Sequence, residues 1–153
     1  MINQPSPSMF AASDKIAAST GDLLALVARL TMGWLFFHYG WMKLMNMAGT
    51  VGYLTSMNVP NPSLMYWPCA LSELLIGIAL ILGVATRYTA IYTFIYLIIA
   101  TVIAHRWWTY PMAQQGAQYA NFCKNLGLMG GALLIFGIGA GRFSVDNWLR
   151  NKR

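Results

Sequence analysis

The sequence predicts an all-α integral membrane protein: a bundle of four transmembrane helices with a short amphipathic helix near the C-terminus. Of the 153 residues, 58% are hydrophobic and only 9% are charged. A soluble domain averages roughly 25% charged residues, because its surface must face water. The apolar residues also gather into four long runs, and so short a chain has too little polar sequence to cover four buried helices in water.

The chain divides into an N-terminal tail, residues 1–21, and one membrane domain, residues 22–153. The tail mixes Ser, Pro and Ala with the charge pair Asp14–Lys15, which predicts a soluble segment with a short interfacial helix around residues 10–18. It lacks a basic stretch before an apolar core, so we expect no cleaved signal peptide. The spans are predicted at about residues 23–44, 64–84, 88–104 and 126–140, near the ~20 residues that cross a ~30 Å hydrocarbon core.

The connections between these spans differ in character. Residues 45–63 contain Asn-Pro, Gly and Ser, which predict a loop. The connection from Gly83 to Arg87 is so short that the second and third spans must be antiparallel neighbours. Residues 106–124 carry aromatic side chains typical of a membrane interface, and after the last span Ser144 is a candidate N-cap for the surface helix.

Lysine and arginine positions predict the topology. Lys43, Arg106 and Lys124 lie on one side of the predicted membrane, and six basic residues lie on the other: Lys15, Arg87, Arg142, Arg150, Lys152 and Arg153. This distribution places both termini in the cytoplasm of a bacterium, with the chain in the inner membrane. It also explains the net charge of +6 without a nucleic-acid partner.

Four ionisable residues fall within or at the end of apolar runs: Arg29, His38, Glu73 and His105. A charge at the bilayer centre costs roughly 2.5–3.5 kcal/mol on insertion scales, so it normally faces the bundle interior and has a partner. Glu73 lies about 14 Å deep from one side and Arg29 about 9 Å from the other, at 1.5 Å per residue. We therefore predict an Arg29–Glu73 ion pair that clamps the first span to the second. In the alternative, Glu73 handles a proton or binds a head group.

His38, Glu73 and His105 all fall in the outer half of the predicted bundle. Together with Arg29 they are the candidate residues of a quinone or lipid site, where imidazoles would bond the carbonyls of a quinone head group. A metal is the weaker alternative, so no metal site is predicted, and structural histidines bonded to backbone or water are a third. Cys69 and Cys123 leave two alternatives open, a disulfide in an oxidising periplasm or ordinary apolar packing.

Several short motifs follow one another along the chain: Arg29-Leu-Thr-Met-Gly33, His38-Tyr-Gly40, Lys43-Leu44, Ser72-Glu73-Leu74, Gly77, Leu82-Gly83, Thr86-Arg87 and Gly139-Ala-Gly-Arg-Phe-Ser-Val-Asp146. They span about residues 29–146, nearly the whole chain. Together, in this order and at the ends of the predicted helices, they resemble the DoxX family of small four-helix membrane proteins. The resemblance implies a link to the membrane part of thiosulfate:quinone oxidoreductase and to membrane-associated oxidoreductase or thiol-redox complexes.

From this resemblance we expect an accessory membrane subunit of a quinone-linked respiratory or redox complex, which anchors partners and shapes a quinone or lipid site. The alternatives are an autonomous quinone-dependent oxidoreductase component and a small transporter or lipid-handling protein. No catalytic residue is predicted, no intrinsic cofactor is expected besides a bound quinone, and the sequence leaves open whether the chain is an enzyme. The expected partners are membrane lipids and either other subunits or further copies of this chain.

Overall fold

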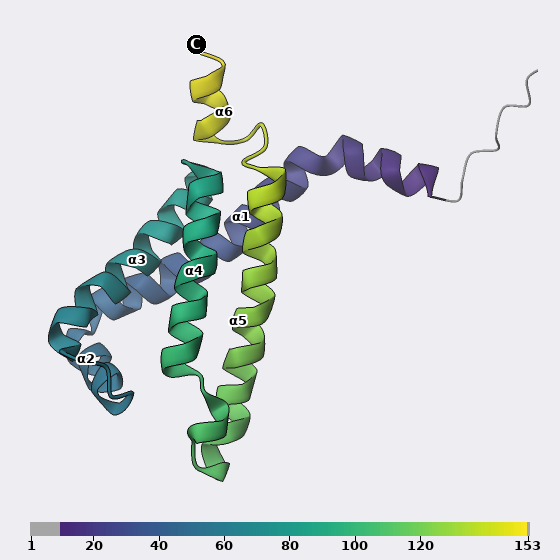
Figure 1. Cartoon of the computed structure of the whole chain (residues 1–153). Helices are drawn as coiled ribbons and strands as arrows, with labels where there is room; N and C mark the ends of the chain where they lie inside the picture. Colours follow the sequence, from purple (N-terminus) through teal and green to yellow (C-terminus); the bar gives the residue numbers. More distant parts are fainter. Residues whose placement is uncertain (1–9, 153) are drawn as a thin grey trace, which may run out of the picture.

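Helices make up almost all of the ordered secondary structure. The computed structural model describes residues 10–152, and within them no strand occurs (Figure 1). In chain order the elements are α1 (Ala11–Met45), α2 (Met47–Ser56), α3 (Pro62–Leu82), α4 (Thr86–Ala104), the 3₁₀ turn η1 (Trp107–Thr109), α5 (Met112–Ile138) and α6 (Val145–Arg150). α1, α3, α4 and α5 are long and apolar enough to cross a membrane, which confirms the predicted all-α membrane bundle.

Two of the spanning helices are longer than the sequence pattern indicates. α1 begins at Ala11, so the described part of the predicted soluble tail continues the first helix; residues 1–9 of that tail lie outside the described residues. This segment stays helical because residues 11–22 contain no proline and include four alanines, the best helix former, at positions 11, 12, 17 and 18. Likewise α5 begins at Met112 rather than near residue 126, since the intervening residues are largely good helix formers.

The predicted 45–63 loop contains a helix, α2, which the sequence reading missed. The Asn46 side chain accepts a hydrogen bond from the backbone N–H of Gly49 at 2.9 Å and caps α2. α2 then packs back on α3 through a small apolar cluster of Leu54, Tyr66 and Ala70. The connection therefore packs against one end of the bundle.

The bundle consists of two helix pairs, α1 with α3 and α4 with α5. Figure 1 shows α3 running beside α1 while α4 runs beside α5. Glycines allow the first pair to approach closely: a Cβ on Gly40 would overlap the backbone of Glu73 and Leu74, and one on Gly77 would overlap the backbone of Phe37. A core cluster that includes Phe36, Leu80, Leu97 and Ile135 joins the pairs.

The tight turn between α3 and α4 makes these two helices antiparallel, as predicted. Gly83 ends α3 in the left-handed region at φ +68°, where a glycine pays no Cβ penalty, and the N–H of Val84 bonds back to the carbonyl of Ala79 at 2.9 Å. This turn lies at the same end of the bundle as α6. We call it the α6 end, and the opposite end, where α2 and η1 lie, the α2 end.

Helix α6 forms as predicted and is fastened to the α3–α4 turn. The Ser144 side chain accepts a bond from the N–H of Asn147 at 3.2 Å, which confirms the N-cap. The carboxylate of Asp146 reaches across to the start of α4 and accepts from the N–H groups of Ala85 at 2.7 Å and Thr86 at 2.8 Å. These two N–H groups have no partner within α4, so α6 supplies the cap that α4 lacks.

Candidate functional site

A cavity of about 600 Å³ lies between the two helix pairs, toward the α2 end. All five longer helices contribute to its wall, and most of that wall is apolar, from side chains such as Leu35, Phe36, Leu97 and Leu128. The polar side chains in it are fewer: Tyr39, Lys43, Tyr53, Ser72, Glu73, Tyr92, Tyr96, His105, Asn121, Lys124 and Asn125. A mostly apolar hollow with a few convergent polar groups is the usual form of a small-molecule site, and ligand pockets measure roughly 300–1,000 Å³.

Glu73 is the centre of the polar part of this cavity. Its residue is 9% exposed, and its carboxylate forms an ion pair with the ammonium of Lys43 on α1 through Oε2. The hydroxyl of Tyr96 on α4 donates to the other oxygen, Oε1, at 2.8 Å. Glu73 therefore bridges the α1–α3 pair to the α4–α5 pair, and both of its oxygens are satisfied, as a buried carboxylate requires.

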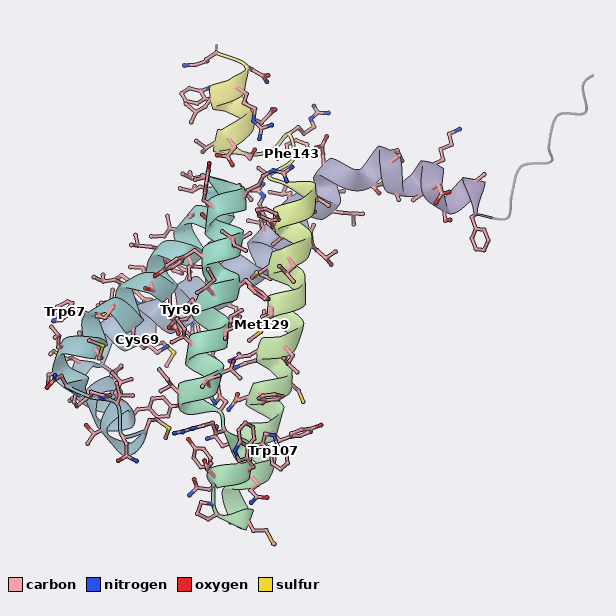
Figure 2. The ribbon with its side chains drawn as sticks, in the orientation of Figure 1. Trp67, Cys69, Tyr96, Trp107, Met129 and Phe143 are labelled. Atoms are coloured by element: carbon pink, nitrogen blue, oxygen red, sulfur yellow. The ribbon has the colours of Figure 1, made fainter. Side chains whose placement is uncertain are left out.

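Two further polar contacts cross between α3 and α4 at this level. The sulfur of Cys69 lies 3.7 Å from the Tyr96 hydroxyl, and Figure 2 shows both side chains between the two helices. The hydroxyls of Ser72 and Tyr92 lie 2.8 Å apart. The described residues thus place three hydroxyl groups and one thiol on the same wall as the carboxylate.

A second set of polar groups lines the cavity at the α2 end. Nδ1 of His105 lies 2.9 Å from Oε1 of Gln118, and the ammonium of Lys124 lies 5.5 Å from the centre of the Tyr39 ring, a cation–π contact that joins α5 to α1. Tyr53 on α2 also faces the cavity, and burial raises the pKa of its hydroxyl above the ordinary value of 10.0. The Tyr53 hydroxyl therefore stays protonated at neutral pH and is available as a donor.

The structure brings Glu73 and His105 to one cavity but leaves His38 outside it. His38 is exposed on the outer face of α1, where its ring lies 6.0 Å from that of Trp34 and 5.7 Å from that of Tyr39, centre to centre. Because successive helical residues are about 100° apart, His38 points away from the core that Phe36 and Gly40 face. The structure therefore places His38 apart from the cavity that Glu73 and His105 line.

The predicted Arg29–Glu73 ion pair does not form. Arg29 is fully buried, but its guanidinium donates to the carbonyls of Leu80 at 3.1 Å, Ile81 at 3.4 Å and Phe143. The reason is the register of the antiparallel α1–α3 pair. Gly40 lies against Glu73, so Arg29, about three turns away, is level with the C-terminal end of α3 instead.

Within residues 10–152, Arg29 therefore bonds backbone carbonyls and forms no ion pair with a carboxylate. The last carbonyls of a helix lack partners within the helix and carry partial negative charge. A guanidinium at that end is stabilised by them and ties α3 to the segment that leads into α6. Arg29 is thus excluded from the candidate ligand site, and its role in the structure is to hold the α6 end together.

Neither a metal cluster nor a disulfide is found where the sequence left these alternatives open. Within residues 10–152 no group of three His, Cys, Asp or Glu side chains gathers closely enough to hold a metal ion. Cys69 and Cys123 are both free thiols, the first half-buried at the cavity and the second exposed. The Cys69 sulfur lies beside the Tyr96 hydroxyl, at 3.7 Å.

The residues that sequence reasoning missed are Lys43, Tyr92 and Tyr96. Lys43 contributes to the predicted topology and to the family resemblance but was not a candidate partner of Glu73, since it lies near the end of a span where lysine usually reaches water. Lys43 and Glu73 are 30 residues apart in the sequence. This separation predicts no contact unless the register of the two helices is known. The two tyrosines lie four apart on α4 and therefore share a face, a pattern equally common in lipid-facing helices.

Comparison with known proteins identifies relatives over most of the chain. The DoxX family model matches residues 24–106, and the SURF4 family model matches residues 67–152. Among curated proteins, the Escherichia coli inner membrane protein YqjF is 34% identical over 131 residues, 86% of this chain and 95% of that protein. The E. coli inner membrane protein YphA is 32% identical over 124 residues, 81% of this chain and 89% of that protein. No solved structure matches the chain.

Proposed function

The chain belongs to the DoxX family, and we propose that it is an accessory subunit of a quinone-linked redox complex in a bacterial inner membrane. In this proposal the cavity beside Glu73 receives the quinone head group, and a partner subunit supplies or takes the electrons. The membrane assignment for this chain is supported by the names of its two E. coli relatives and by its four spanning helices.

The observation that carries the proposal is the chemistry of the cavity wall. A quinone head group is a flat apolar ring with two carbonyl acceptors, so its site needs apolar walls and a few hydrogen-bond donors. The cavity provides aromatic and aliphatic walls together with the ammonium of Lys43 and the hydroxyls of Tyr96 and Tyr92. These donors lie between spanning helices, where a membrane-dissolved quinone is found.

The Lys43 ammonium is held in place but its donors are not exhausted, whereas the single O–H of Tyr96 is already donated to Glu73. An ammonium has three N–H donors, and Glu73 accepts one of those of Lys43. The two remaining donors are free to bond a carbonyl oxygen without breaking the ion pair. Glu73 is also the only carboxylate in the cavity wall, which makes it the group able to accept a proton when a bound quinol is oxidised by the partner.

Quinone binding can be tested on the full chain in lipid nanodiscs. Titration with decylubiquinone, followed by quenching of tryptophan fluorescence, should give saturable binding. Replacing Lys43 with Met should weaken that binding about tenfold, the loss of one hydrogen bond of ~1.4 kcal/mol. His38→Leu is the matched control, because His38 is exposed outside the cavity, and its affinity should equal that of the wild type.

Two outcomes would overturn the proposal. Affinity that is unchanged in Lys43→Met would place the quinone elsewhere. A chain that purifies alone in mild detergent from its native membrane, without any stoichiometric redox partner, would contradict the role of an accessory subunit.

A further inference from the structure

A second, shallower hollow of about 270 Å³ continues from the cavity along the seam between α3 and α4. Its walls are Leu75, Ile76 and Ala79 from α3 and Tyr88, Thr89 and Tyr92 from α4. These residues lie closer to the α3–α4 turn than the cavity does, so the hollow extends toward the α6 end. Leu75, at 61% exposure, and Tyr88, at 80%, place it on the outer surface of the bundle. In the membrane this surface faces hydrocarbon.

Tyr92 separates the two hollows, since it lines both. Its hydroxyl bonds Ser72 across the seam at 2.8 Å, and both groups belong to the wall of the larger cavity. Hydrogen bonds between spanning helices are weak on average, so this contact can open without disturbing the helix pairs. Opening it would join the polar cavity to the apolar groove in one continuous channel.

We infer that the ligand of the cavity enters sideways from the bilayer between α3 and α4, past the Ser72–Tyr92 contact, and keeps a hydrocarbon chain in the groove lined by Leu75, Ala79, Tyr88 and Thr89. This inference rests on the proposed function and narrows it to quinones that carry a long apolar chain. The match is one of polarity: the head group meets the ammonium and hydroxyls around Glu73, while the chain meets only apolar and weakly polar side chains.

The walls of the groove are mostly apolar, and the hydrogen bond between Ser72 and Tyr92 lies where the groove meets the cavity. Ile76 faces the core cluster, whereas Leu75 and Ala79 are four apart and share the outer face of α3. A hydrocarbon chain that lies along this face takes the place of the lipid tails that would otherwise cover it. Neither the hydrocarbon chain nor the groove is therefore exposed to water as the ligand enters. A ligand that reached the cavity from the α2 end would instead pass Tyr53, Val59 and Lys124.

Photolabelling distinguishes the two routes. The probe is a benzoquinone with an alkyl chain that carries a diazirine midway, bound to the full chain in nanodiscs of phosphatidylethanolamine and phosphatidylglycerol and then irradiated. We expect labels on residues 75–79 and 88–92 that excess decylubiquinone removes. A fatty acid with the same diazirine but no quinone ring is the control, because lipid-like labelling of the exposed seam is not removed by that competitor.

The outcomes separate this inference from the proposed function. Competable labels concentrated on residues 53–59 and 121–124 would overturn sideways access and leave quinone binding standing. The absence of any competable label would overturn both.

The association rate of a variant tests the role of the Ser72–Tyr92 contact independently of photolabelling. Tyr92→Phe removes the hydroxyl that bonds Ser72 and keeps the ring in the groove, so decylubiquinone should bind about threefold faster or more. Ala120→Phe is the matched control, since Ala120 is exposed on α5 and lines neither hollow. An association rate equal to that of the wild type in Tyr92→Phe would show that the Ser72–Tyr92 contact is not on the route.

Discussion

Lys43 and Glu73 should be energetically coupled, and the expected coupling energy follows from the burial and charge of the ion pair. The side chains are 24% and 12% exposed, so water screens the pair only in part. Two unit charges about 4 Å apart attract by ~4 kcal/mol at an effective dielectric constant of 20. Because desolvation of both groups offsets much of this attraction, we expect a net coupling of about 1–3 kcal/mol.

The two single variants should differ in cost. Lys43→Met leaves the Glu73 carboxylate deep in the span with only the Tyr96 hydroxyl, and we expect a loss of about 2–3 kcal/mol. Glu73→Gln keeps an oxygen for Tyr96, and the freed ammonium of Lys43 lies close enough to the end of α1 to extend toward the interface. We expect that variant to lose about 1–2 kcal/mol.

The assay is a double-mutant cycle by reversible SDS unfolding in mixed micelles. The double variant should lose less than the sum of the two singles by the coupling energy. The control is the cycle of Arg29→Met with Glu73→Gln, which should be additive within ~0.5 kcal/mol, because Arg29 bonds carbonyls and not Glu73. Strict additivity in the Lys43 cycle, or clear coupling in the Arg29 cycle, would refute the assignment of partners.

Three further predictions follow from the packing and the charges. Arg29→Met should lower the free energy of unfolding by about 3 kcal/mol or more in the same assay, since it removes hydrogen bonds to three carbonyls; a loss under ~1 kcal/mol would contradict its role. Gly77→Ala should cost about 1–3 kcal/mol, because its Cβ would overlap the Phe37 backbone. Gly130→Ala, where a Cβ meets nothing within 4 Å, should be neutral or stabilising, and equal effects at both sites would refute the close α1–α3 contact. A periplasm-active reporter fused after residue 153 should be silent and one inserted after Met57 active, as the basic residues predict; the reverse pattern would invert the topology.

Local sequence chemistry was enough to predict the spans and the C-terminal helix. Each span is defined by its own apolar run, and Ser144 caps α6 with a bond to a residue only three positions on. The same kind of signal was ambiguous at Asn46, since asparagine is common both in turns and at N-caps. Helix α2 was missed because its stability comes from Leu54 packing on Tyr66 of α3, which the local sequence does not show.

The partners of the buried charges depended on information that one sequence does not contain. The depths of Arg29 and Glu73 in the predicted membrane suggested that the two could pair. Each depth is counted along its own helix, however, and gives no information on the register between the helices. The actual register is set where Gly40 and Gly77 let α1 and α3 approach, and a shift of one turn changes depth by ~5.4 Å. That register places Lys43, rather than Arg29, beside Glu73.

The two ends of the bundle use their polar side chains differently, and this difference indicates where a ligand can bind. At the α6 end the charged groups bond backbone at helix ends: Arg29 to the end of α3, Arg87 to the carbonyls of Phe136 and Gly137 on α5, and Asp146 to the start of α4. A ligand that displaced any of them would leave orphaned helix termini.

Around Glu73 the polar side chains bond one another instead, through Lys43 and Tyr96. A ligand carbonyl can accept from the N–H groups of Lys43 that Glu73 does not use, so the ion pair stays intact when the ligand binds. The cavity at the α2 end therefore combines free volume with unused hydrogen-bond donors, while the α6 end provides the rigid frame that keeps the two helix pairs in register around it.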